Sequence, residues 1–169
     1  MITTFGEYIK KPDINSVSNE FWKMVRIANW NTVIKGYKEN PIIDQTHKDF
    51  LQLARFRIYS KFSLNEIRKF REEYDVIYFQ LYDWFFSTFS EGNFNLSDDG
   101  YTDFISSIIG KGKTFIKKCI KNNNLVLEMA KSEDYAESFL YLLVCNERLY
   151  DDIKAKYDPF FRDVRKYNL

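Results

Sequence analysis

Gly112, Lys113 and Thr114 are the residues of this chain whose types and order could bind a phosphate group. They match the end of a phosphate-binding loop, in which backbone N–H groups and a lysine hold the phosphates. The full motif requires a glycine at position 107 and a preceding strand, but Ser107 stands there and the preceding spacing is helical. A glycine that ends one helix before the next begins explains the same residues. We therefore favour a helix–helix junction over a nucleotide site.

A second candidate lies just upstream, where oxygen-bearing side chains alternate as in a calcium-binding loop. They are Glu91, Asn93, Asn95, Ser97 and Asp99. Leu96 stands where that loop requires glycine, and Thr102 stands where it requires a bidentate glutamate. A turn capped by Ser97 or Asp98 explains the same residues. We therefore predict no metal ligands and no cofactor.

No arrangement typical of catalysis is recognisable. His47 is the single histidine, and no nucleophile stands at a recognisable distance from it. Cys119 and Cys145 lie in apolar helical runs, which predicts buried thiols rather than a zinc site or a disulfide. Adjacent carboxylates such as Asp98 and Asp99 point about 100° apart on a helix and do not share a proton. We predict no catalytic residue, with an enzyme or small-ligand binder that uses the Ser97–Lys113 turn as the alternative.

Positive charge is concentrated around one short predicted helix. The residues are Lys111, Lys113, Lys117, Lys118 and Lys121. A solvated helix face is the simplest explanation, and a docking patch for an acidic partner is the functional one. Nucleic-acid binding through Lys111–Lys121 is a further alternative. It is disfavoured because 25 basic and 24 acidic residues give a net charge of only +1.

Aromatic residues are more numerous than one buried stripe requires, with 16 Phe, 12 Tyr and 3 Trp. Because aromatic side chains dominate binding hot spots, Trp22 and Trp84 are candidates for contact with a partner. An exposed Trp30, Phe86 or Phe160–Phe161 pair would also mark a partner site. The candidate binding residues are therefore Trp22, Trp84, Asp98, Asp99 and Lys113.

The elements that position these residues have helical spacing. The spacing predicts a short helix over residues 19–30, a loop at Gly36 and Pro41, and a helix capped by Asp44. Ser63 and Glu66 form a capping box that starts a helix of about 24 residues with one apolar stripe. Further helices are expected over 99–109, 113–121 and 125–130, with an asparagine turn at 122–124. Ser132 is expected to cap a long central helix with the apolar run 139–145.

These elements predict an all-α fold, a single-domain bundle of about six to eight helices. We expect residues 1–18 to be an irregular lead-in and 19–169 to form the helical domain. The longest apolar run has seven residues, from Phe139 to Cys145, whereas a membrane-spanning helix needs about 20. The first residues lack the pattern of a secretory signal, so we expect a cytoplasmic protein.

Several motifs resemble a bacterial family, the helical domain of unknown function 4240. They are Asn19–Trp22, the aromatic helix that ends near Trp84, Ser97–Phe104 and Ile108–Lys113. The resemblance covers roughly Phe21 to Tyr150. The chain departs from the family pattern at Ile105, where the family has Arg, at Ser107, where it has Trp, and at Asn122–Leu125. A family site that uses that Arg would be missing here.

The resemblance implies an all-helical fold in the bacterial cytoplasm and no established activity. Small domains of this kind occur near toxin–immunity or regulatory genes. Together with the residues above, this favours a non-catalytic protein-binding domain, such as an immunity or regulatory protein, with a toxin as one candidate partner. The oligomeric state stays open.

Overall fold

Helices form the regular structure of this protein in the computed structural model, which describes residues 10–39, 54–89, 96 and 98–131. No strand occurs among those residues, so the predicted all-α fold is confirmed. The helices are α1 (Asn19–Ala28), α2 (Trp30–Glu39), α4 (Leu64–Thr88), α5 (Asp98–Gly110), α6 (Lys113–Lys121) and α7 (Asn124–Lys131). Residues 54–59 are also helical.

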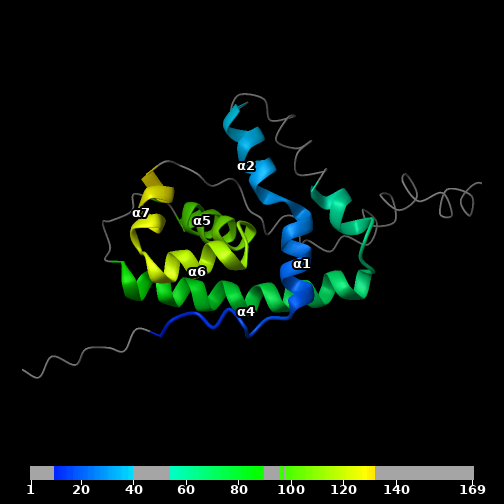
Figure 1. Ribbon diagram of the computed structural model, residues 1–169, viewed down its shortest axis with the longest axis horizontal. Helices are drawn as coiled ribbons and strands as arrows, with labels where there is room; N and C mark the ends of the chain where they lie inside the picture. The colour runs from blue at the N-terminus through cyan, green and yellow to red at the C-terminus, as the bar shows by residue number, and fades with distance from the viewer. Residues whose placement is uncertain (1–9, 40–53, 90–95, 97, 132–169) are drawn as a thin grey trace, which may run out of the picture.

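The 25-residue α4 supports the other helices along one of its sides (Figure 1). Its start is the predicted capping box: the Ser63 N–H donates to Glu66 Oε2 at 2.7 Å, and the Glu66 N–H donates to Ser63 Oγ at 3.3 Å. These bonds satisfy donors that a helix otherwise leaves unpaired at its first turn. α1 and α5 both pack on α4, and α5 in turn contacts α2 and α6.

The buried stripe of α4 forms the centre of the core, as its spacing predicts. Its buried residues are Ile67, Phe70, Tyr74, Ile77, Leu81, Trp84 and Phe85. The ring of Phe70 lies 4.6 Å from that of Phe21 on α1, and the ring of Phe85 lies 5.6 Å from that of Phe104 on α5. Aromatic contacts thus join three helices that are distant in sequence.

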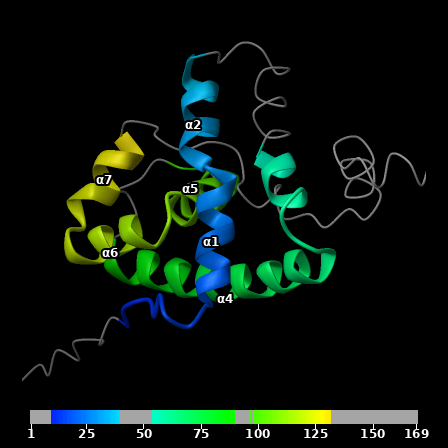
Figure 2. The same cartoon turned by 45° about the vertical axis from the view of Figure 1, so that its right-hand side comes forward.

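The helix expected over residues 19–30 is in fact two helices. Asn29 adopts the left-handed conformation, with φ 52°, and its N–H donates to the carbonyl of Arg26. α2 then begins at Trp30 and continues through Gly36, so the predicted loop at Gly36 is wrong. Glycine costs a helix only about 1 kcal/mol relative to alanine, which the burial of Trp30 and Ile34 offsets. Figure 2 shows α1 and α2 in succession above α4.

Two serines in α5 are buried, which the sequence pattern did not indicate. Ser106 and Ser107 are both 0% exposed. The Ser106 hydroxyl and the Tyr74 hydroxyl form a hydrogen bond of 2.6 Å, and Trp30 Nε1 donates to Ser107 Oγ at 3.3 Å. These bonds satisfy the buried hydroxyls, whose desolvation would otherwise cost free energy.

Residues 10–18 contain no helix or strand, but they belong to the packed structure. Ile14 and Val17 are buried in the core. The Asp13 N–H donates to Gln80 Oε1 at 2.6 Å, and the Ser18 hydroxyl donates to Glu73 Oε2 at 2.8 Å. This segment therefore lies along one side of α4, and Ser18 also caps α1 by accepting from the Phe21 N–H.

α6 spans 113–121 as predicted, and α7 extends the expected 125–130 helix by one residue at each end. The Asn122 side chain accepts from the Asn124 N–H at 3.1 Å, which confirms the asparagine turn between them. The predicted helix start at Asp44, the long helix from Ser132, His47, Cys145 and Phe160–Phe161 lie outside the described residues. Among the described helices, none has the length and apolarity required to cross a membrane.

Candidate functional site

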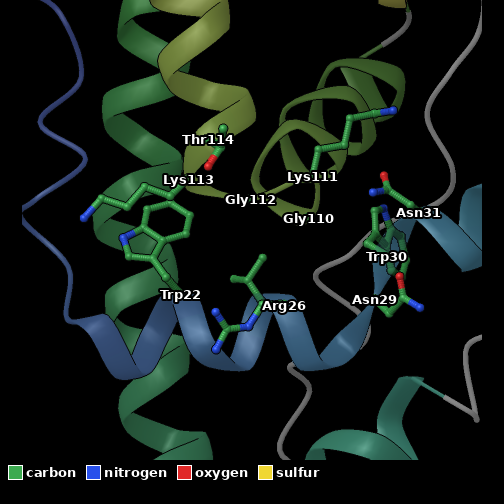
Figure 3. A pocket seen from close by; sticks show the side chains of 11 residues that line it. Trp22, Arg26, Asn29, Trp30, Asn31, Gly110, Lys111, Gly112, Lys113 and Thr114 are labelled. Atoms are coloured by element: carbon green, nitrogen blue, oxygen red, sulfur yellow. The ribbon is translucent and has the colours of Figure 1, made fainter.

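A pocket of about 390 Å³ lies where the turn between α5 and α6 meets α1 and the start of α2 (Figure 3). Its lining residues come from two segments far apart in sequence. They are Trp22, Val25, Arg26, Asn29, Trp30, Asn31, Gly110, Lys111, Gly112, Lys113 and Thr114. The pocket therefore contains the Gly-Lys-Gly-Lys segment of the sequence.

The turn is shaped by Gly112. The Gly112 N–H donates to the carbonyl of Ile109 at 2.8 Å, which closes the end of α5. Gly112 itself has φ +90°, a conformation that residues with a side chain rarely adopt. Its carbonyl then accepts from the N–H groups of Phe115 and Ile116, which begins α6. The predicted helix–helix junction is confirmed, and α5 stands where a phosphate-binding loop requires a strand.

Gly110 is required for a different reason, which is close packing. A Cβ atom at Gly110 would lie 2.5 Å from Cδ1 of Trp30. The Trp30 indole is fully buried and donates to Ser107 Oγ at 3.3 Å, which holds it in this position. Only glycine at this position lets the start of α2 pack against the end of α5 and form one wall of the pocket.

The first turn of α6 adds positive electrostatic potential. Gly112 is the N-cap of α6, and it supplies no side-chain acceptor to the N–H groups of the first turn. The uncapped end of a helix carries a partial positive charge of about half a unit. Lys113 and Thr114 at this end line the pocket, so the helix dipole and the side-chain charge have the same sign.

Among the described residues, the charged groups of the lining are all cations: Arg26 from α1, and Lys111 and Lys113 from the turn. Figure 3 shows Arg26 and Lys113 on the Trp22 side of the pocket, with the Lys111 ammonium directed away from them. Lys111 Nζ lies 5.4 Å from the centroid of the Phe115 ring. No Asp or Glu among the residues that the structure describes lines the pocket, so these side chains favour a negatively charged group.

Trp22 supplies an apolar wall that is fixed in position. Its indole N–H donates to the carbonyl of Ile14 at 3.3 Å, and its ring packs edge-on against Phe21 at 4.9 Å. The side chain is 8% exposed and lines the pocket. A ligand for this site would therefore place an anionic group near Arg26 and Lys113 and an apolar group near Trp22.

A row of lysines continues from the pocket along α6. Lys113, Lys117 and Lys121 are spaced four residues apart and therefore lie on one face. Lys117, Lys118 and Lys121 are exposed. We refer to Lys113, Lys117 and Lys121 as the lysine row.

Of the five predicted binding residues, Trp22 and Lys113 meet in this pocket although 91 positions separate them. Asp98 and Asp99 form the start of α5, whose opposite end makes the pocket, about 20 Å away at 1.5 Å per residue. Trp84 lies in the core, 3% exposed, with its ring 6.0 Å from that of Phe89. Neither the aspartates nor Trp84 therefore belongs to this site.

Sequence reasoning missed Arg26, Asn29 and Asn31, which complete the polar lining. Arg26 follows Trp22 by four residues on α1, so it shares a helix face with a candidate that was identified. That spacing is the signal that could have found it. Trp30, expected as a possible exposed aromatic, is fully buried, because its indole packs on Gly110 and bonds to Ser107.

The described residues near the site include neither a cluster of metal ligands nor an exposed thiol. In the part of the chain that the structure describes, no three His, Cys, Asp or Glu side chains cluster as a metal site would require. Cys119 on α6 is buried, and burial raises the pKa of its thiol to about 11. A thiol with such a pKa is a weak nucleophile at neutral pH.

Comparison with known families places the chain in one of them. The model of the family described as protein of unknown function (DUF4240) matches residues 17–152, and the chain therefore belongs to that family. The matched span includes α1, the α5–α6 turn and the whole pocket lining. No curated protein and no solved structure matches the chain.

Proposed function

We propose that this protein is a non-catalytic protein-binding domain that docks an acidic segment of its partner in the basic pocket and along the lysine row. One observation carries the proposal: Arg26 and Lys113 line the pocket on the same side, and no carboxylate of the described residues lines it with them. Burying a carboxylate of a partner against these groups would form charge-assisted hydrogen bonds, which are the stronger kind.

The lysine row supports the same partner chemistry. Residues 111–121 contain five lysines and no Asp or Glu. Like charges four residues apart destabilise a helix by about 0.2–0.5 kcal/mol per pair. No carboxylate among the described residues forms an ion pair with Lys113, Lys117 or Lys121. An acidic partner would remove this repulsion on binding and would be steered toward the surface.

The pocket walls define the rest of the preferred ligand. Trp22 offers apolar surface, while Asn29 and Asn31 offer side-chain amides. An extended or turn segment with an Asp or Glu next to an apolar residue satisfies both. A free phosphate group would use only the cations and the first turn of α6, so the composite lining favours a peptide.

The distribution of perturbed groups supports binding rather than catalysis. Active sites usually hold titratable groups with shifted pKa values. The shifted groups among the described residues are Arg55, Glu66, Tyr74 and Cys119, and none of them lines the pocket.

The test is the binding of a fluorescein-labelled peptide that alternates Glu with Leu, measured by fluorescence anisotropy. We expect wild-type protein to bind it, with an affinity that falls as salt rises, because surface charges are screened. Lys113→Glu combined with Lys117→Glu should weaken binding at least tenfold. Lys61→Glu is the control, since Lys61 is exposed and precedes the start of α4 at Leu64. α6 lies toward the other end of α4 (Figure 1).

Equal weakening by the control and the double variant would contradict the proposal. Tighter binding of a single-stranded oligonucleotide than of the acidic peptide would favour the nucleic-acid alternative. Stabilisation by phosphate or nucleotides in a thermal-shift screen, without peptide binding, would favour a small-ligand site instead.

We further propose that the domain works in a bacterial cytoplasm as an immunity or regulatory protein. The resemblance to small domains near toxin–immunity genes motivates this setting. A toxin-like reading frame next to the gene, whose product co-purifies with wild-type protein and not with the Lys113→Glu/Lys117→Glu variant, would support it. Neighbouring genes unrelated to toxins or regulation would contradict it.

A further inference from the structure

A second surface, on α4, exposes large apolar side chains and goes beyond the function proposed above. Phe79 is 61% exposed, Val76 46%, and Tyr82 and Phe86 39% each. Their spacing of three, three and four residues puts them on one side of the helix. We refer to Val76, Phe79, Tyr82 and Phe86 as the aromatic face of α4.

The rings of this face are held in order by contacts with one another. The Tyr82 and Phe86 rings lie 4.4 Å apart, and Tyr78 contacts Phe79 at 5.6 Å and Tyr82 at 6.2 Å. Phe86 also contacts Tyr101 of α5 at 5.1 Å. Rings that are already positioned lose little conformational entropy on binding, which favours association.

The aromatic face lies between two parts of the protein that cover the flanks of α4. On one flank, Gln80 and Glu73 bond to the segment of residues 10–18. On the other flank, the Tyr78 hydroxyl donates to Thr102 of α5 at 3.4 Å. The buried stripe occupies the opposite side of the helix, toward α1 and α5. The aromatic face therefore points away from the basic pocket.

The charged residues around the aromatic face of α4 indicate which kind of partner could bind there. From Glu72 to Thr88, α4 contains Glu72, Glu73, Asp75 and Asp83 but no Lys or Arg. Glu72 and Asp83 are exposed, and Asp75 pairs with Arg71 at 3.2 Å. A second copy of the chain would bring these carboxylates against each other, which is unfavourable. An occupant with basic groups beside its apolar residues has the complementary charge.

We propose that the aromatic face of α4 docks an amphipathic helix of another protein, with a row of apolar side chains flanked by Lys or Arg. Val76 and Phe86 are ten residues apart, about 15 Å along the axis at 1.5 Å per residue. About three turns of a partner helix match that length. Helix packing of this kind brings side chains of one helix between those of the other.

The test uses a defined probe, a labelled helical peptide with Leu at positions i, i+3, i+4 and i+7 and Lys on both flanks. We expect wild-type protein to bind it, and Phe79→Ala to weaken binding at least tenfold, because aromatic anchors dominate interfaces. Phe79 is the most exposed large apolar residue described, so its removal should leave the fold intact. Asp83→Asn should weaken binding of the Lys peptide, and a peptide with Glu on its flanks should not bind.

Lys61→Ala is the control: Lys61 is exposed and lies ahead of the first turn of α4, outside both proposed surfaces, so this variant should leave the affinity for the Lys peptide unchanged. Equal affinity of wild-type and Phe79→Ala protein would overturn the proposal, as would absence of binding by the wild type. A wild-type dimer in sedimentation that Phe79→Ala converts to monomer would identify a second copy as the occupant and would also overturn it. If the wild-type protein fails to bind the Glu–Leu peptide, the basic pocket is not a docking site, but the proposal for the aromatic face of α4 is unaffected, because the two surfaces are separate.

Discussion

Gly110 and Gly112 illustrate how two glycines one residue apart serve different physical needs. Gly110 is needed because the Trp30 ring occupies the space of a Cβ, and Gly112 is needed because its φ is +90°. The sequence predicted a helix stop at this position. It could not predict the contact with Trp30, because that contact joins residues 80 positions apart.

Gly110→Ala should destabilise the fold by about 1–3 kcal/mol, the usual cost of overpacking a core. Thermal and urea unfolding would measure the loss. Trp30→Leu removes the ring that the new methyl group would meet. The Gly110→Ala/Trp30→Leu variant should therefore lose less stability than the sum of the two single losses. Simple additivity of the two losses would contradict the packing argument.

Cys119 should be unreactive in the folded protein because burial raises the pKa of its thiol to about 11. At pH 8 such a group is about one part in a thousand thiolate, and the thiolate is the reactive form. In a Cys145→Ser variant, iodoacetamide should modify Cys119 at least a hundredfold more slowly in native buffer than in denaturant. Mass spectrometry of the Cys119 peptide measures both rates, and equal rates would refute the predicted burial.

At the scale of elements, α4 was the most predictable part of the molecule. Its capping box and apolar stripe depend on local spacing, and local spacing is visible in sequence. α2 was missed because Gly36 is a weak helix former, whereas the tertiary packing of Trp30 and Ile34 favours the helix. The buried serines of α5 were missed for a similar reason, since their partners lie on other helices.

The capping box of α4 should make stability depend on pH. Hydrogen bonds from the backbone and side chain of Ser63 lower the pKa of Glu66. Because the folded pKa lies below the unfolded one, the stabilisation is present above the ordinary Glu pKa of 4.5 and is lost as pH falls through the folded value. The difference in unfolding free energy between wild type and Glu66→Gln should therefore shrink from pH 7 to pH 3.

Ser63→Ala tests the same element without a change of charge. The loss of an N-cap hydroxyl costs about 0.5–2 kcal/mol. For a domain of this size, each kcal/mol lowers Tm by about 2–4 °C. An unchanged Tm would show that the capping box contributes nothing to the stability of α4.

At the scale of the whole molecule, the net charge is only +1, but basic and acidic residues are concentrated on different helices. The α5–α6 turn and α6 present lysines, whereas the exposed side of α4 from Glu72 to Thr88 presents carboxylates beside aromatic rings. The lysine cluster was apparent in the sequence. The pocket was not, because it requires α1 to lie against the α5–α6 turn, which brings Arg26 and Trp22 to Lys113.

The binding of charge-matched peptides to charge-reversed protein tests the central claim most directly. Wild-type protein should bind the Glu–Leu peptide, and the Lys113→Glu/Lys117→Glu variant should bind it at least tenfold more weakly, a loss of about 1.4 kcal/mol or more. The same variant should gain affinity for a Lys–Leu peptide of identical length, because the charges are then complementary again. To exclude binding at the acidic aromatic face of α4, both proteins would carry Phe79→Ala. If the reversed variant binds the Glu–Leu peptide as tightly as the wild type does, the basic pocket and the lysine row are not the docking site.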